Sequence, residues 1–160
     1  DIKLEMGVPV FEWKKIPLSK DVDHKNINLK INHMELKEGF AVNVGNPHVV
    51  FFVKDCFKYN LEEIGPIIEN HELFPEKVNV TFAQIKDAKN ILVNVWERGA
   101  GLTKACGTAA CATGVVAFEK KLTGNNTNIH FKEGFLNIEY NGSISMTGPV
   151  SDIEKVRLKL

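Results

Sequence analysis

The chain has 160 residues, of which 44% are hydrophobic and 25% are charged, as in an ordinary globular domain with a core of its own. Twenty Lys and Arg balance twenty Asp and Glu, so charge gives no reason to expect binding to nucleic acid or to an acidic membrane. No apolar stretch is long enough for a bilayer span or a signal segment, and three cysteines make no disulfide framework, which favours the cytoplasm. We expect one domain over 1–160.

Alternating apolar residues predict strands along most of the chain. The predicted strands cover 2–6, 27–36, 40–44, 48–54, 78–85, 90–96, 127–131, 135–140, 143–147 and 155–160. The sequence opens at Asp1, without a Met, directly into the first of these runs, which suggests that an upstream part is absent. Asn141-Gly142 is typical of a two-residue hairpin turn, because both residues accept positive φ angles. The last third of the chain is therefore expected to be antiparallel.

Two helices are expected among the strands. The first covers about 61–70, where Asn60 can cap the helix and acidic residues favour its first turn, although Gly65-Pro66 interrupts its middle. The second covers about 108–121 and is apolar or small on nearly every side, so it belongs inside the fold. These elements predict an α+β architecture, in which a mixed and mostly antiparallel sheet or barrel wraps around a buried central helix.

The segment 97–111 carries the residues best suited to chemistry. It runs Glu97-Arg98-Gly99-Ala100-Gly101, then Leu102-Thr103-Lys104, then Ala105-Cys106-Gly107-Thr108-Ala109-Ala110-Cys111. At the predicted helix start, free amides of Gly107 and Thr108 form a site for a carboxylate. The helix dipole, with Lys104 nearby, would lower the pKa of the Cys106 thiol below its free value of about 8.5. Such a thiol suits either nucleophilic attack or proton transfer.

Other interpretations of this segment stay open. Cys106 could be a small packing residue, and Glu97 with Arg98 a solvated pair at a strand end. Cys106 and Cys111 could bind a metal ion with a histidine, but residues five apart lie roughly 140° apart around a helix. The sequence has no Cys-x-x-Cys or His-x-x-x-His pair, so we expect no metal site. Core positions are expected for Cys111 and Cys56.

A second constellation is Gly45-Asn46-Pro47-His48, a turn before the apolar run Val49-Val50-Phe51-Phe52-Val53. This turn would place the amide of Asn46 and the imidazole of His48 at the mouth of a sheet. A lone histidine before a strand is more often a residue that packs or caps a turn than a catalytic one. The other four histidines have no comparable context.

Four segments resemble the diaminopimelate epimerase family in order and spacing, over nearly the whole chain. They are Gly45-Asn46-Pro47-His48, Phe74-Pro75-Glu76-Lys77-Val78-Asn79-Val80, Glu97-Arg98-Gly99-Ala100-Gly101 and Ala105-Cys106-Gly107-Thr108. That family of isomerases interconverts LL- and meso-diaminopimelate for lysine and cell-wall synthesis, with two cysteines on opposite faces of the α-carbon and no pyridoxal phosphate. The resemblance implies no cofactor here, and that Cys106 is the second of the two cysteines. It also implies a C-terminal half, facing a similar N-terminal half across the active-site cleft.

The resemblance implies roles for further residues at the distal end of the substrate. Asn46, Asn79 and Arg98 would hold that non-reacting end, and Glu97 would take its ammonium group. At the reacting end, the amides of Gly107 and Thr108 would bind the carboxylate and help to stabilise the carbanion.

His48 and Glu97 match positions thought to adjust the thiol pKa values. One thiol would take the α-proton while the other returns a proton on the opposite face.

The leading hypothesis is an epimerase half that works only with its other half. Neither Cys56 nor Cys111 looks able to replace the partner thiol, so the isolated chain is expected to be inactive. The alternatives are a non-catalytic module for carboxylate binding or interaction, and another cofactor-independent racemase of the same fold, such as a proline racemase relative. Expected partners are diaminopimelate, the N-terminal half and a second copy bound through the exposed apolar face, but not nucleic acid or a membrane.

Overall fold

The computed structural model describes residues 1–150, which form one ten-stranded sheet and two helices. The strands are β1 (Ile2–Gly7), β2 (Ile27–Ile31), β3 (Met34–Asn43), β4 (Pro47–Phe52), β5 (Asn79–Asp87), β6 (Asn90–Glu97), β7 (Gly101–Leu102), β8 (Asn126–Phe131), β9 (Gly134–Tyr140) and β10 (Ile144–Gly148). The helices are α1 (Leu61–Glu69) and α2 (Gly107–Glu119). Strands follow the order β1-β10-β9-β8-β6-β5-β4-β3-β2, and β7 pairs with β6.

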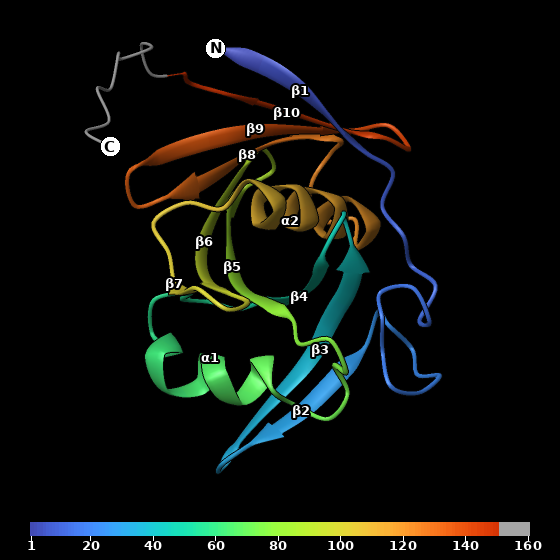
Figure 1. The fold of residues 1–160 in the computed structure, drawn as a ribbon. Coiled ribbons are helices and arrows are strands. Elements are labelled where there is room, and N and C mark those ends of the chain that lie inside the picture. The colour runs from blue at the N-terminus through green and yellow to red at the C-terminus, as the bar shows by residue number, and fades with distance from the viewer. Residues whose placement is uncertain (151–160) are drawn as a thin grey trace, which may run out of the picture.

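The sheet is mixed and mostly antiparallel, as predicted. Only β4 with β5 and β6 with β8 pair in parallel among the described strands. Each parallel pair is joined through a helix, because parallel neighbours need a crossover connection. The crossover helices are α1 and α2, and Figure 1 shows them on opposite sides of the central strands. The sheet curls around α2 without closing, since β1 and β2 form its two ends within residues 1–150.

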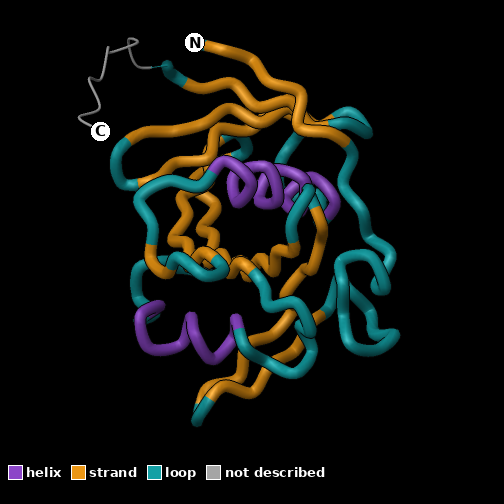
Figure 2. The backbone as a smooth tube through the Cα atoms, in the orientation of Figure 1, coloured by secondary structure: helices purple, strands orange, loops and turns teal. Residues whose placement is uncertain are grey.

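Helix α2 is the buried central helix that the sequence predicts. Every residue from Ala109 to Ala117 is buried, and the helix packs in one cluster with apolar residues of the surrounding strands. At Gly114 an added Cβ would come within 2.7 Å of Ile138 Cγ2 on β9, so the close contact between helix and strand requires glycine. In Figure 2 the strands surround this helix on several sides. Cys106, which immediately precedes this helix, is also buried.

Helix α1 packs its apolar side against the face of the sheet that is turned away from α2. Leu61, Ile64 and Ile68 are buried in a second cluster against the sheet. Asn60 precedes the helix, but its side chain makes no capping hydrogen bond, contrary to the prediction. Pro66 lies inside the helix without ending it, although proline removes one helical donor. No helix within residues 1–150 has both the length and the apolar character needed to cross a membrane.

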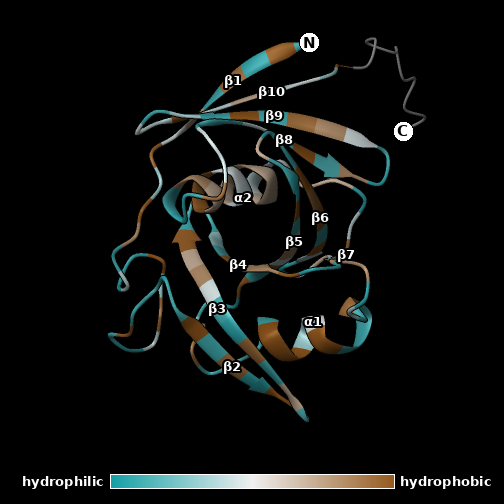
Figure 3. Ribbon diagram, turned by 180° about the vertical axis from the view of Figure 1, so that it is seen from behind, coloured by the Kyte–Doolittle hydropathy of each residue, from teal (hydrophilic) through white to brown (hydrophobic). Residues whose placement is uncertain are grey.

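The predicted strand over 27–36 is wrong, because the chain turns between β2 and β3. Asn32 has a φ of 54°, a left-handed conformation that asparagine tolerates in turns. Apolar residues alternate within each of the two strands, as the banding of β2 and β3 in Figure 3 illustrates. The alternation shifts by one residue between Ile31 and Met34, where the turn lies. The hairpin predicted at Asn141-Gly142 is confirmed, but its loop has three residues and not the expected two, because Tyr140 lies opposite Ile144. The predicted strand over 155–160 lies outside the described residues.

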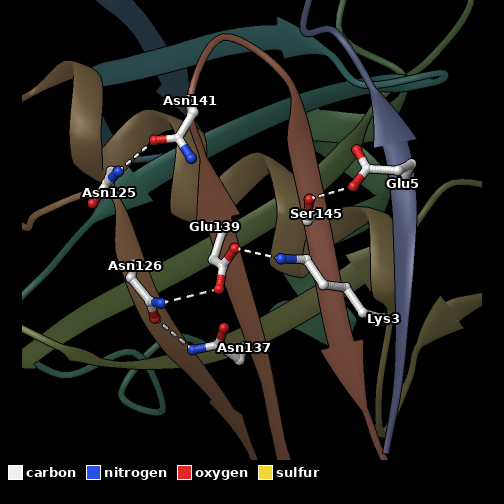
Figure 4. Close-up of polar contacts among 8 residues, drawn as sticks. All are labelled: Lys3, Glu5, Asn125, Asn126, Asn137, Glu139, Asn141 and Ser145. Atoms are coloured by element: carbon white, nitrogen blue, oxygen red, sulfur yellow. Dashed lines mark hydrogen bonds and ion pairs between the residues drawn. The ribbon is translucent and has the colours of Figure 1, made fainter.

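One face of β8, β9, β10 and β1 is held together by polar side chains. The amide of Asn137 donates to Asn126 Oδ1 at 2.7 Å, and Lys3 pairs with Glu139 at 2.6 Å (Figure 4). The Ser145 hydroxyl donates to the carboxylate of Glu5 at 2.8 Å. These links join β1 to the sheet on the face turned away from α2.

Candidate active site

The residues that the motifs predict meet at one end of the central strands β4, β5 and β6. Strands β4 and β5 begin there and β6 ends there, while α2 begins beside them. His48 is the register partner of Asn79 across the parallel pair. Alternation along the strands turns the side chains of His48, Asn79 and Glu97 toward α2, as it does their neighbours Val50 and Val95, which pack in its cluster.

Cys106 is the N-cap residue of α2, and its sulfur takes part in the cap. The amide of Ala109 donates to Cys106 Sγ at 3.4 Å, and the amide of Ala110 donates to the Cys106 carbonyl at 3.0 Å. The amides of Gly107 and Thr108 donate to no acceptor in the described part of the chain. Two backbone donors at a helix N-terminus therefore lie beside the thiol, which is the arrangement expected of a carboxylate site.

A hydrogen-bonded chain connects Cys106 to a buried histidine. Thr108 Oγ1 lies 3.5 Å from Cys106 Sγ and accepts a hydrogen bond from Asn46 Nδ2 at 3.2 Å. His48 Nε2 lies 2.8 Å from Asn46 Oδ1 and 3.1 Å from Thr108 Oγ1. Because Asn46 Oδ1 can only accept, the network assigns the proton to His48 Nε2. The motifs predicted a role for the Thr108 amide but missed its hydroxyl, whose only signal is its position two residues after Cys106.

The pKa of the Cys106 thiol is raised, so the expected lowering is wrong. Burial raises this pKa most, the Thr108 hydroxyl and the Ala109 amide oppose the rise, and the Glu97 carboxylate adds to it. The sequence could not indicate burial: only 7% of Cys106 is exposed. Lys104 does not assist the thiolate as expected, because it pairs with Glu133 at 2.8 Å in solvent. The resting thiol is therefore protonated near neutral pH.

His48 is held neutral by its surroundings. Burial, followed by the charge of Arg98, lowers the pKa of the imidazole to about 3. His48 Nδ1 is buried and has no hydrogen-bond partner within residues 1–150. The neutral imidazole is connected to Cys106 by hydrogen bonds through Asn46 and Thr108.

Asn79 connects two of the predicted motifs. Its side-chain amide donates to the Pro47 carbonyl at 2.8 Å, and its Oδ1 accepts from the backbone amide of Arg98 at 2.8 Å. The guanidinium of Arg98 donates to the Glu76 carbonyl at 3.0 Å. Asn79 therefore positions the segment that carries Arg98, whereas the resemblance implies a direct contact with the substrate.

The other two cysteines are core residues, as predicted. Cys56 and Cys111 are fully buried, in the clusters on the α1 and α2 sides of the sheet respectively. Burial raises the pKa of Cys56 to about 11, and burial together with nearby Cys106 raises the pKa of Cys111 to about 12. In the part of the chain that the structure describes, no three His, Cys, Asp or Glu side chains gather where they could hold a metal ion.

A surface cleft of about 530 Å³ lies elsewhere, between the loop after Ser19 and residues 71–73. It contains none of the predicted site residues. The predicted site residues lie instead where α2 begins.

The chain is similar to known proteins along most of its length. The family model described as Diaminopimelate epimerase matches residues 40–153. The diaminopimelate epimerase of Pelagibacter ubique is 50% identical over 99% of this chain and 60% of its own length, and that of Erythrobacter litoralis 45% identical over 94% and 56%. The chain thus spans little more than half the length of these relatives. A solved structure described as a predicted epimerase, from Pseudomonas aeruginosa, has the same fold, with a TM-score of 0.52, 12% identity, and coverage of 90% of this chain and 53% of that one.

Proposed function

Because this chain belongs to the diaminopimelate epimerase family, we propose that it supplies Cys106 as one of two acid–base thiols that interconvert LL- and meso-diaminopimelate. The observation that carries the proposal is the position of the Cys106 thiol, at the start of α2 beside the unengaged amides of Gly107 and Thr108. The second thiol would come from the other half of the family protein, because this chain spans about 60% of its Pelagibacter relative.

The two amides would bind the α-carboxylate of the substrate. When the α-proton leaves, negative charge spreads from the α-carbon into this carboxylate, and donors fixed in advance stabilise that charge without reorganising. The N-terminal end of α2 adds a favourable partial positive charge. The same contacts would hold the α-carbon beside Cys106, so that stabilisation of the carbanion and delivery of a proton occur in one place.

Because its pKa is raised, the Cys106 thiol is suited to donate a proton to the substrate in one direction of the reaction. The partner thiolate would take the α-proton from one face, and the Cys106 S–H would give its proton to the opposite face of the carbanion. The new C–H bond leaves Cys106 as a thiolate, to which the Thr108 hydroxyl and the Ala109 amide can donate. In the reverse direction that thiolate acts as the base, so the protons balance over each turnover.

The remaining predicted residues would adjust the pKa of the Cys106 thiol and hold the distal end of the substrate. Neutral His48 would act on Cys106 through Asn46 and Thr108, and the Glu97 carboxylate would act on its pKa directly. Glu97 is also the residue proposed to take the distal ammonium group. Arg98, with Asn46 and Asn79, would complete the contacts with that end.

We further propose that the other half, or a second copy of the chain, covers the apolar surface of β1. Ile2 and Leu4 on this strand are 49% and 50% exposed, which is high for large apolar side chains in a sheet. Light scattering over a range of concentrations tests self-association of the chain alone. A monomer throughout would contradict the self-association, and suppression of association by the added N-terminal half would support one shared surface.

Chiral analysis of diaminopimelate incubated with the chain tests the proposed reaction. The chain alone should give no inversion, because Cys56 and Cys111 are buried with raised pKa values. The chain joined to the N-terminal half of a family member should restore it. Inversion by the chain alone would contradict the two-half mechanism, and binding without inversion by the joined protein would favour a carboxylate-binding module.

A further inference from the structure

We propose that Glu69 is a positioning residue, whose buried carboxylate holds the loop from Glu97 to Gly101 in the conformation that presents Glu97 and Arg98 to the substrate. The inference rests on the proposed function, and it adds a residue from α1, which none of the motifs includes. The position of Glu69 in the sequence, near the end of an ordinary amphipathic helix, gives no sign of such a role.

Both carboxylate oxygens of Glu69 accept hydrogen bonds from the segment that carries the site. Oε1 accepts from the indole N–H of Trp96 at 2.9 Å, and Oε2 accepts from the backbone amide of Gly99 at 3.2 Å. Only 7% of Glu69 is exposed. A buried carboxylate is costly unless donors satisfy it, so these two contacts explain how the charge is accommodated.

The location of Glu69 in α1 is locally unfavourable. It is the last residue of the helix, where the helix dipole disfavours a negative charge, and the last turn contains no basic residue. Stability of the helix alone therefore gives no reason for a carboxylate there. The contacts with Trp96 and Gly99 do give one.

Trp96 connects α1 to the loop by packing and by a hydrogen bond. At Gly65 on α1 an added Cβ would lie 2.4 Å from Trp96 Cδ2, so only glycine lets the ring pack against the helix. On the other side, a Cβ at Gly101 would lie 3.4 Å from Trp96 Cη2. The half-buried indole therefore packs tightly against Gly65 and lies near Gly101, and its N–H donates to Glu69.

The backbone between Trp96 and Gly101 is fixed from two sides. Asn79 accepts from the amide of Arg98, and Glu69 accepts from the amide of Gly99. Both anchored amides lie within one turn, which the Ala100 amide closes by donating to the Glu97 carbonyl at 3.1 Å. Because the Glu97 and Arg98 side chains start from this backbone, the two anchors together set where both charges lie.

Replacing Glu69 with glutamine tests the role with little change in shape. An amide can accept with its oxygen, but its NH₂ group would face either the Trp96 indole N–H or the Gly99 amide, so one contact is lost. Glu62→Gln is the matched control, since Glu62 is exposed on the same helix. Trp96→Phe is a second variant that removes one donor and leaves the Gly99 contact in place.

Two readouts are needed, hydrogen exchange of the Gly99 amide in the chain and steady-state kinetics of the chain joined to an N-terminal half. We expect Glu69→Gln to speed exchange at Gly99 and to raise KM for diaminopimelate about tenfold, because the contacts of Arg98 with the non-reacting end are weakened. The effect on kcat should be smaller, within about threefold, and arises from the displaced Glu97, which acts on the pKa of Cys106. Trp96→Phe should raise KM less, and Glu62→Gln should change neither quantity.

Faster exchange at Gly99 with an unchanged KM, or unchanged exchange, would overturn the positioning role. The failure of the proposed function looks different, because the unsubstituted joined protein would then show no turnover at all.

Discussion

Thr108 Oγ1 lies 3.5 Å from Cys106 Sγ, within reach of a hydrogen bond from the hydroxyl to the sulfur. The same hydroxyl oxygen accepts from Asn46, which in turn accepts from His48. These contacts orient the Thr108 O–H toward the thiolate form of Cys106. Thr108 therefore has two parts in the proposed site, a backbone amide for the substrate carboxylate and a side chain for the thiol.

Thr108→Val should raise the pKa of Cys106 further. The change keeps the shape of the side chain but removes a donor that favours the thiolate, and a hydrogen bond to a charged group corresponds to a pKa change of about one or more. The rate of alkylation of Cys106 against pH measures it. Thr113→Val is the control, because Thr113 donates within α2 to the Ala109 carbonyl. If the alkylation rate depended on pH in the same way in both variants, the contact between Thr108 and the thiolate would be contradicted.

Glu97→Gln should lower the pKa of Cys106, because the Glu97 carboxylate is one of the groups that raise it. Lys104→Gln should leave this pKa unchanged, since the ammonium group pairs with Glu133 in solvent. The rate of alkylation of Cys106, measured against pH, gives the pKa of the thiol in both variants. A rise in the pKa after Lys104→Gln would mean that Lys104 does reach the thiolate, as the sequence suggests.

The stability of the fold should depend on the neutral state of His48. The pKa of its imidazole falls from 6.5 to about 3 on folding, so the unfolded chain takes up a proton between these values and the folded chain does not. This contribution to stability is present above about pH 6.5 and decreases as the pH falls toward 3, by at most about 1.4 kcal/mol per pH unit.

Urea unfolding of the unsubstituted chain and of His48→Gln measures the difference. The variant should lose less stability over this pH range, because it lacks the titrating imidazole. Parallel pH dependences would show that His48 does not titrate on unfolding.

Gly114→Ala should destabilise the chain by about 1–3 kcal/mol, since its Cβ would meet Ile138 at 2.7 Å in a packed core. Gly124→Ala is the matched control, because an added Cβ there has no atom within 4 Å. Urea denaturation gives both values. A neutral Gly114→Ala would mean that α2 can move away from β9.

The sequence predicts most of the elements because their patterns are local. Alternation locates the strands, and the small apolar run locates α2 inside the sheet. The turn at Asn32 was missed because apolar residues alternate on both sides of it, although the alternation shifts by one residue between Ile31 and Met34. The pKa of Cys106 was misjudged, since the helix dipole can be anticipated from sequence whereas burial by distant strands cannot. Glu69 was missed for a similar reason: its partners, Trp96 and Gly99, are about thirty residues away.

The most direct test of the account is solvent deuterium incorporation at the α-carbon by the chain joined to an N-terminal half. Either stereoisomer should give an inverted product carrying one deuterium from D₂O. Cys106→Ala should abolish this product in both directions, whereas Cys56→Ala should retain it. Inversion that continues undiminished in Cys106→Ala would contradict the claim that Cys106 is one of the two acid–base thiols.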